Sequence, residues 1–291
     1  MRRVIPGVVA SAAVVSAAVA GEAVPDGWAL IADSVAQFSG VQGQGGWHYL
    51  FDTGVGTAES PMPTFVQQGQ YQIWCAGQSP TFDSFCILMA GWSHANAPGA
   101  CNTPWSGTQR PIRRWINRTA EALRVHVEIE AATTTAGLLT QLQGDGAIIA
   151  EWIWTPGNAI PVDAWIDVPP TTSISIIDDP MSNGCHGDGH VNRTRIYARD
   201  CDGDSVPDSV EIRTGAVIDL NVNGIPDSCE IPTCETVDLT DSGLVDGADL
   251  GILLGEWGSH EVGVRSDLNR DGTVDGSDLG ILLSFWGPCD G

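Results

Sequence analysis

The sequence predicts a mainly β protein, in which an N-terminal β-sandwich is followed by two small modules built on acidic loops. Three observations predict this order. Residues 21–199 contain short apolar segments separated by turn-forming residues, whereas residues 200–291 repeat one spacing of acidic side chains. Near the end, a segment is written twice: residues 245–258 and 274–287 are identical at eleven of fourteen positions.

The first 20 residues have the features of an export signal. Arg2 and Arg3 precede an apolar run over residues 4–19, and small residues at 18–20 form a cleavage site. Pro6 and Gly7 interrupt that run, so we do not expect it to remain as a membrane span. We therefore expect a secreted, extracellular protein with no membrane span after signal cleavage.

Residues 21–199 are predicted to form the β-sandwich, with a jelly-roll-like arrangement. The segment 123–129 alternates apolar and polar residues with period two, which is typical of a half-buried strand. Gly, Pro, Asn and Asp clusters separate the candidate strands. Many short strands with such turns favour two packed sheets. The further candidate strands are 147–154, 164–168, 172–177 and 191–198.

Residues 200–291 are strongly acidic, with 20 Asp and Glu against 3 Arg and hence a net charge of −17. Four twelve-residue segments begin at positions 200, 219, 238 and 267, and each places oxygen side chains at loop positions 1, 3, 5, 9 and 12. This spacing wraps a hard cation, and position 7 adds a backbone carbonyl. Magnesium prefers fewer protein ligands, so Ca²⁺ is the expected cofactor.

The predicted ligands differ in charge from loop to loop. The loop at 200–211 offers five carboxylates, whereas the loop at 238–249 offers three and should bind most weakly. The predicted ligands are Asp200, Asp202, Asp204, Val206, Asp208, Glu211, Asp219, Asn221, Asn223, Ile225, Asp227, Glu230, Asp238, Thr240, Ser242, Leu244, Asp246, Asp249, Asp267, Asn269, Asp271, Thr273, Asp275 and Asp278.

The duplicated segment resembles a dockerin domain of type I over residues 234–291, with two EF-hand-like calcium loops that each precede one helix. This resemblance implies a small α-helical module that binds a cohesin-like partner. The chain departs from the family pattern at loop positions 10 and 11, which hold Gly247-Ala248 and Gly276-Ser277, and its two helices carry no basic residue. Residues 200–233 are similar to thrombospondin type 3 calcium repeats, which implies a stiff spacer.

Eight cysteines, an even number, fit an oxidising compartment. Their positions predict two disulfides, Cys201 with Cys229 and Cys234 with Cys289, which would close the spacer and the last module. Three pairings remain open for the four cysteines of the N-terminal domain, which are Cys75, Cys86, Cys101 and Cys185.

Tryptophans are concentrated in the N-terminal domain, and exposed aromatic faces suit sugar rings. Trp47 and Trp92 lie among Gly, Ser and His, so they are the candidate ligand-binding residues. The segment 32–49, together with 112–115, is similar to an uncharacterised β-rich domain of secreted bacterial proteins that resembles carbohydrate-binding modules. That resemblance implies binding of a polysaccharide or cell-surface glycan.

No catalytic residue can be assigned, and we expect a non-catalytic role: polysaccharide binding by the sandwich, with tethering by the dockerin. One alternative is a polysaccharide-degrading enzyme, a glycoside hydrolase or lyase, that uses two carboxylates. The other is a non-catalytic structural surface protein. The acidic, lysine-free composition argues against nucleic-acid binding. The candidate carboxylates are Glu128, Glu130, Glu151, Asp163 and Asp167; His186, Asp188 and His190 could meet a metal, although a glycine-rich turn is the simpler interpretation.

Overall fold

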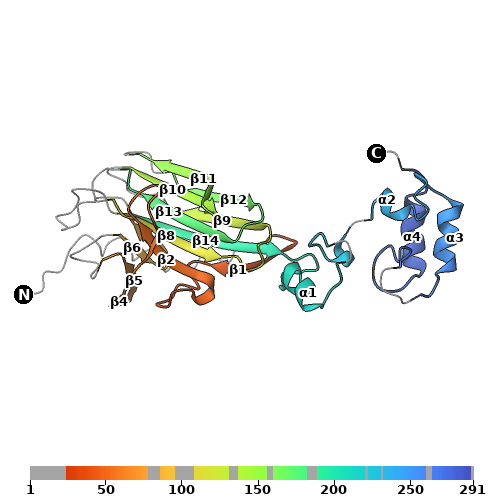
Figure 1. Cartoon of the computed structure of the whole chain (residues 1–291), viewed down its shortest axis with the longest axis horizontal. Coiled ribbons are helices and arrows are strands. Elements are labelled where there is room, and N and C mark those ends of the chain that lie inside the picture. The colour runs from red at the N-terminus through yellow and green to blue at the C-terminus, as the bar shows by residue number, and fades with distance from the viewer. Residues whose placement is uncertain are drawn as a thin grey trace, which may run out of the picture. The chain divides into compact units, whose positions relative to one another are not determined.

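A computed structural model describes residues 24–77, 86–95, 108–130, 137–155, 160–181, 189–219, 222–230, 232–259 and 264–289 (Figure 1). It divides into two compact units, one ending at Arg199 and the other beginning at Asp200. The predicted export signal and the side chains of Cys101, Cys185, His186, Asp188 and Asn221 lie outside the described residues.

The N-terminal unit contains two antiparallel sheets. In the described part, the first sheet has the order β12 (Val162–Val168), β9 (Leu123–Ile129), β14 (Gly189–Arg199), β7 (Trp92–His94), β6 (Ile87–Met89), β5 (Tyr71–Cys75) and β4 (Thr64–Gln68), and β1 (Trp28–Asp33) also pairs with β14. The second has the order β11 (Ala147–Trp154), β10 (Leu138–Gly144), β13 (Ser173–Asp179), β8 (Arg110–Ile116), β2 (Trp47–Asp52) and β3 (Ser60–Pro61). A 3-10 turn, η2 (Gln44–Gly46), precedes β2.

One apolar core joins the two sheets and confirms the predicted β-sandwich. Every second residue of β9 enters this core, as do Leu138 and Leu142 of β10 in the opposite sheet. Period-two alternation buries one face of the strand at 123–129, and both 123–129 and 147–154 form strands with the bounds that the sequence predicts.

A buried polar network also connects the two sheets. Arg113 of β8 donates to Asn192 Oδ1 of β14 at 2.8 Å, and Asn192 Nδ2 donates to Ser93 Oγ at 2.8 Å. Ser93 Oγ in turn donates to Asp178 Oδ2 of β13 at 2.5 Å. The network satisfies polar groups that would otherwise be costly to bury.

The C-terminal unit contains short helices and a small apolar core. Its elements are α1 (Asp208–Thr214), η3 (Asp227–Cys229), α2 (Cys234–Val237), β15 (Leu244–Val245), α3 (Gly247–Gly255), α4 (Gly276–Ser284) and β16 (Gly287–Pro288). The core consists of Val237, Leu239, Val245, Leu253, Leu268, Val274 and Leu282. No helix in the described part of the chain has the length and apolar character needed to cross a membrane.

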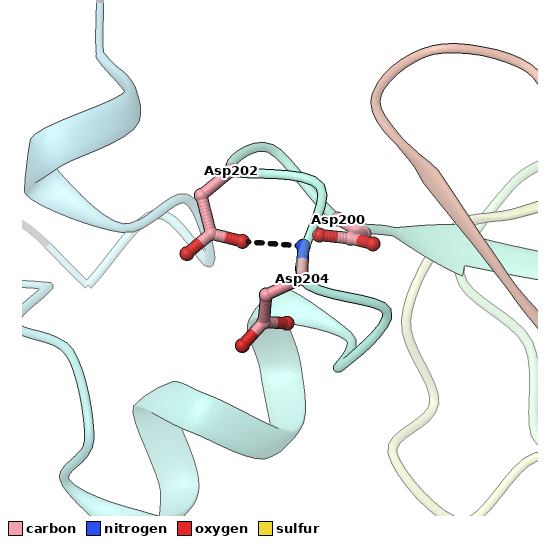
Figure 2. Close-up of side chains that lie close together, drawn as sticks. All are labelled: Asp200, Asp202 and Asp204. Atoms are coloured by element: carbon pink, nitrogen blue, oxygen red, sulfur yellow. Dashed lines mark hydrogen bonds between the residues drawn. The ribbon is translucent and has the colours of Figure 1, made fainter.

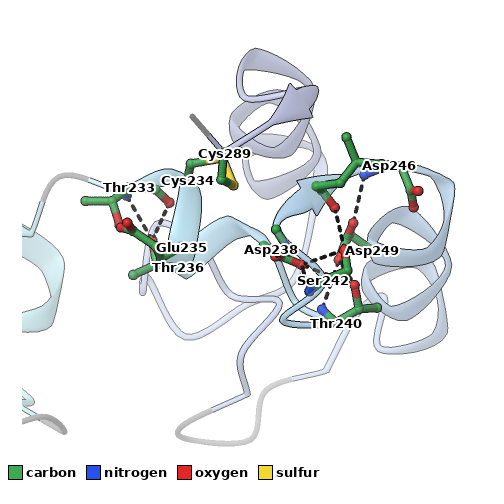
Figure 3. The surroundings of a disulfide bond; sticks show 12 residues. Thr233, Cys234, Glu235, Thr236, Asp238, Thr240, Ser242, Asp246, Asp249 and Cys289 are labelled. Atoms are coloured by element: carbon green, nitrogen blue, oxygen red, sulfur yellow. Dashed lines mark hydrogen bonds between the residues drawn. A yellow bond between two sulfur atoms is a disulfide. The ribbon is translucent and has the colours of Figure 1, made fainter. Parts of the chain in front are cut away.

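The structure contains both disulfides that the sequence predicts in this unit. Cys201 is bonded to Cys229, and Cys234 to Cys289, so the second bridge joins α2 to the last residues of the unit (Figure 3). Cys75 and Cys86 lie on neighbouring segments of the sandwich but on opposite faces of the sheet, since Cys86 enters the main core and Cys75 packs with Ile73 and Ile87.

Candidate metal-binding loops

The four acidic loops share one turn conformation at loop positions 4 and 6. In each, the residues at loop positions 4 and 6 have a positive φ, between 56° and 87°. The position-1 aspartate of each loop accepts a hydrogen bond from the position-6 amide, at distances of 2.5 to 3.0 Å. This turn directs the position-1 carboxylate back toward the amides of its own loop. The residues at positions 4 and 6 are Gly203 and Ser205, Val222 and Gly224, Asp241 and Gly243, and Arg270 and Gly272.

The first loop gathers its carboxylates most closely. One oxygen from each of Asp200, Asp202 and Asp204 lies within 4.8 Å of the others (Figure 2). Glu211, at position 12 in α1, is only 8% exposed, and its Oε2 is buried with no hydrogen-bond partner among the described residues. Burial and the four neighbouring aspartates raise the pKa of Glu211. A divalent cation would neutralise this concentration of negative charge.

The second loop is in contact with a protein cation. Arg270, at position 4 of the fourth loop, lies 3.1 Å from Asp227 Oδ1 and also contacts Glu230. These two acids are at positions 9 and 12 of the second loop. Asp219 accepts the amides of Asn223 and Gly224, so the turn itself matches that of the other loops.

In the third loop, hydrogen bonds from within the loop occupy both oxygens of the position-1 carboxylate. Asp238 accepts the amides of Ser242 and Gly243 and the hydroxyl of Thr240 (Figure 3). Burial opposes ionisation, but these donors outweigh it and hold the pKa of Asp238 below its ordinary value. Arg265 adds a cation, because it donates to both carboxylate oxygens of Asp241.

The fourth loop leaves one carboxylate oxygen without a partner. Asp267 Oδ1 is buried and accepts no hydrogen bond from the described residues. Burial and the nearby Asp278 and Asp271 raise the pKa of Asp267. Asp278 is fully buried and accepts the amides of Leu268, Asn269 and Asp275.

In the third and fourth loops, the residues at positions 9 and 12 also form the N-terminal cap of the helix that follows the loop. Asp246 caps α3 and Asp275 caps α4, because each side chain accepts an amide of the first helical turn. The position-12 aspartate in turn accepts the backbone amide of the capping residue, which completes a capping box. The same side chains therefore fix the start of the helix and the wall of the loop. In these loops and in the first, the donor set is all oxygen and mostly anionic, which fits a hard cation such as calcium.

The two tryptophans predicted to bind a ligand differ in their surroundings. Trp47 is 1% exposed, and its Nε1 donates to Gln37 Oε1 at 2.9 Å, so it is a core residue and not a binding surface. The prediction was wrong because its Gly-rich flank forms the η2 turn while β2 carries the indole into the core. Trp92 is partly exposed and packs against Gly189 and His94.

Three of the carboxylates considered for glycoside hydrolysis contact basic side chains on the outer face of the first sheet. Asp163 contacts His126 at 2.6 Å, Asp167 contacts Arg124 at 2.9 Å, and Glu128 contacts Arg195 at 2.9 Å. Glu130 and Glu151 are exposed. His190 is buried beside Asp178, at 3.3 Å.

No protein-family model matches the chain, and no curated protein matches it either. Its structural neighbours include several carbohydrate-binding modules. They include the CBM36-1 domain of a multidomain xylanase from the hindgut metagenome of Trinervitermes trinervoides, with 13% identity, 35% of this chain and 88% of that chain covered, and a TM-score of 0.23. A CBM36 module in complex with calcium and xylotriose gives 13% identity, 35% and 91% coverage, and a TM-score of 0.23. A family 35 module from Clostridium thermocellum gives 11% identity, 36% and 88% coverage, and a TM-score of 0.22. At these values the similarity assigns no ligand to this chain.

Proposed function

We propose that this is a secreted, calcium-stabilised modular protein that binds polysaccharide through its β-sandwich and a cohesin-like partner through its C-terminal module. The calcium claim is supported by one observation above all: the first and fourth loops each hold a buried carboxylate oxygen with no hydrogen-bond partner among the described residues. Buried carboxylates in proteins are usually paired or bound to a metal. Bound calcium would supply the missing positive charge.

Calcium content tests this claim directly. The full chain, dialysed against micromolar calcium, should retain two to four ions per molecule when its metal is counted by mass spectrometry. We expect the first and fourth loops to fill at the lowest free calcium concentration. A protein that retains no calcium at micromolar concentration would contradict the claim.

Docking is proposed from the two helices that follow the third and fourth loops. Their last turns and the residues just after them expose the same apolar residues at matching positions. Leu254 and Leu283 are 53% and 52% exposed, and Trp257 and Trp286 are 47% and 51% exposed. Exposed aromatic and aliphatic pairs are typical of protein-binding surfaces. A cohesin-type domain from the same secretome should bind the full chain, and Trp257→Ala with Trp286→Ala should abolish that binding without changing the calcium content.

Polysaccharide binding is proposed for the sandwich because the outer face of its first sheet carries two partly exposed indole rings, Trp28 and Trp165, near the carboxylates of Asp163 and Asp167. The full chain should be retarded in native gels that contain a soluble polysaccharide and not in gels without it. Mobility that is unchanged across neutral and acidic polysaccharides would contradict this part of the proposal.

A further inference from the structure

The outer face of β12, β9, β14 and β1 is a regular grid of polar and aromatic side chains. The strands lie side by side at one end of the first sheet (Figure 1). Because Val125 and Val127 of β9 enter the core, the alternate residues point outward. Strand pairing then fixes the rows of the grid. They are Asp163, Glu128 and Arg193; Trp165, His126, Arg195 and Asp33; and Asp167, Arg124 and Tyr197.

Trp165 packs against two aromatic rings of neighbouring strands on this face. Its ring stacks on the His126 ring with a centroid distance of 4.3 Å and an interplanar angle of 14°, and it also contacts Tyr197 at 5.1 Å. The His126 side chain beside it is fully buried, whereas Trp165 is itself partly exposed. One face of the indole is thus held against the His126 ring, while the Trp165 side chain stays partly open to solvent.

Two carboxylates flank this indole along the same strand. Asp163 and Asp167 are two residues before and after Trp165, which places them about 7 Å away on either side. They are 77% and 76% exposed, yet His126 and Arg124 hold them in place. A flat apolar ring between two fixed acceptors matches a sugar ring, which has an apolar C–H face and hydroxyl groups around its edge.

A second indole extends the surface. The Arg124 guanidinium carbon lies 5.2 Å from the Trp28 ring centroid and 6.0 Å from that of Trp165, so both rings border one guanidinium. Trp28 is partly exposed. Two rings on one face suit a ligand of several sugar units more than a single sugar.

Charge on this face indicates which class of glycan it fits. The outward acids are Asp33, Glu128, Asp163 and Asp167, and the outward bases are Arg124, Arg193, Arg195 and Arg199, so formal charges cancel. Arg193 is paired with Asp33, as Arg124 is with Asp167. A balanced, internally paired face gives no net attraction for a uronate or sulfate.

We infer that Trp165 and Trp28, with Asp163 and Asp167, form the binding site for a neutral polysaccharide chain. This inference rests on the proposed polysaccharide binding and names its site and ligand class. Trp165 and Trp28 differ from the two tryptophans that the sequence suggests, which are Trp47 and Trp92.

Affinity electrophoresis of the full chain tests the inference, with xylan, mannan and mixed-linkage glucan as neutral polysaccharides and pectate as the acidic one. Trp165→Ala should weaken binding to the best neutral polysaccharide about tenfold or more, and Trp165→Phe should restore part of it. Asp167→Asn, at an exposed position that cannot affect folding strongly, should weaken it severalfold. Ile153→Ala is the matched control on the other sheet, where Ile153 is 52% exposed, and should leave binding unchanged.

The outcomes separate the site from the function. If the wild-type chain binds a neutral polysaccharide and both Trp165→Ala and Asp167→Asn bind it equally well, the proposed function stands and this site is wrong. Binding to pectate alone would overturn the ligand class. If the wild-type chain binds none of the four, both the function and the site are contradicted.

Discussion

Among single residues, the position-6 glycines of the acidic loops show most directly how sequence sets the loop. Gly272 has a φ of 87°, a conformation that residues with a Cβ rarely adopt. Ser205 adopts the corresponding conformation in the first loop, with a φ of 74°, and Gly203 supplies the flexibility at position 4 there. The four loops therefore reach the same turn with glycine at either of two places.

Gly272→Ala should destabilise the C-terminal unit by about 1 kcal/mol, because the new Cβ disfavours the left-handed backbone. Space is not the cause, since nothing lies within 4 Å of a Cβ at this position. Thermal unfolding in saturating calcium measures the change. Gly280→Ala, at an open position inside α4, is the control and should stabilise by up to about 1 kcal/mol. A loss of stability in both variants would contradict the backbone explanation.

Glu211→Gln tests the role of the buried position-12 carboxylate. The substitution keeps the side-chain shape but removes the charge and one of two metal-binding oxygens, so the chain should bind one calcium ion fewer in a calorimetric titration. Glu235→Gln removes the same charge from an exposed residue outside the loops and should leave the number of ions unchanged. Equal calcium content in the two variants would rule out Glu211 as a ligand.

On the scale of structural elements, arginines divide the four loops into two classes. Arg270 contacts acids of the second loop and Arg265 contacts Asp241 of the third, whereas the first and fourth loops each keep a buried oxygen with no partner in the described structure. A nearby guanidinium competes electrostatically with a bound cation. We expect the first and fourth loops to bind calcium more tightly than the other two.

Arg270→Met should therefore tighten calcium binding at the second loop by roughly five- to tenfold, since a unit charge about 4 Å away contributes about 1 kcal/mol or more. A competition titration against a calcium indicator would resolve the weak sites. Arg213→Met, on the exposed side of α1, removes the same charge outside the loops and should change nothing. Weaker binding in Arg270→Met would mean that the arginine supports the ion.

Elements that depend on local sequence could be predicted, and contacts between distant segments could not. The strand at 123–129 was predictable because burial of one face imposes period two, and the four loops because their ligands are local in sequence. The contact of Arg270 with Asp227 joins residues 43 positions apart, so no local pattern reveals it. Trp165 was missed for a related reason: only strand pairing places its ring against that of His126.

For the whole molecule, electrostatic repulsion between acidic side chains opposes folding of the C-terminal unit far more than that of the N-terminal unit. A net charge of −17 in residues 200–291 is held around a core of seven buried apolar residues. Two disulfides reduce the entropy of its unfolded chain, but they leave the charge unchanged. The N-terminal unit has a much larger core and no comparable acidic loops among its described residues. Calcium should therefore stabilise the C-terminal unit and leave the stability of the N-terminal unit unchanged.

Differential scanning calorimetry of the full chain, in calcium and then in excess chelator, tests the central claim that calcium stabilises the acidic loops. A ligand at 1,000 times its dissociation constant adds about 4 kcal/mol per site. We predict two transitions in calcium, of which the one from the C-terminal unit falls by tens of degrees or disappears in chelator while the sandwich transition stays in place. If neither transition moves on chelation, calcium does not stabilise this protein.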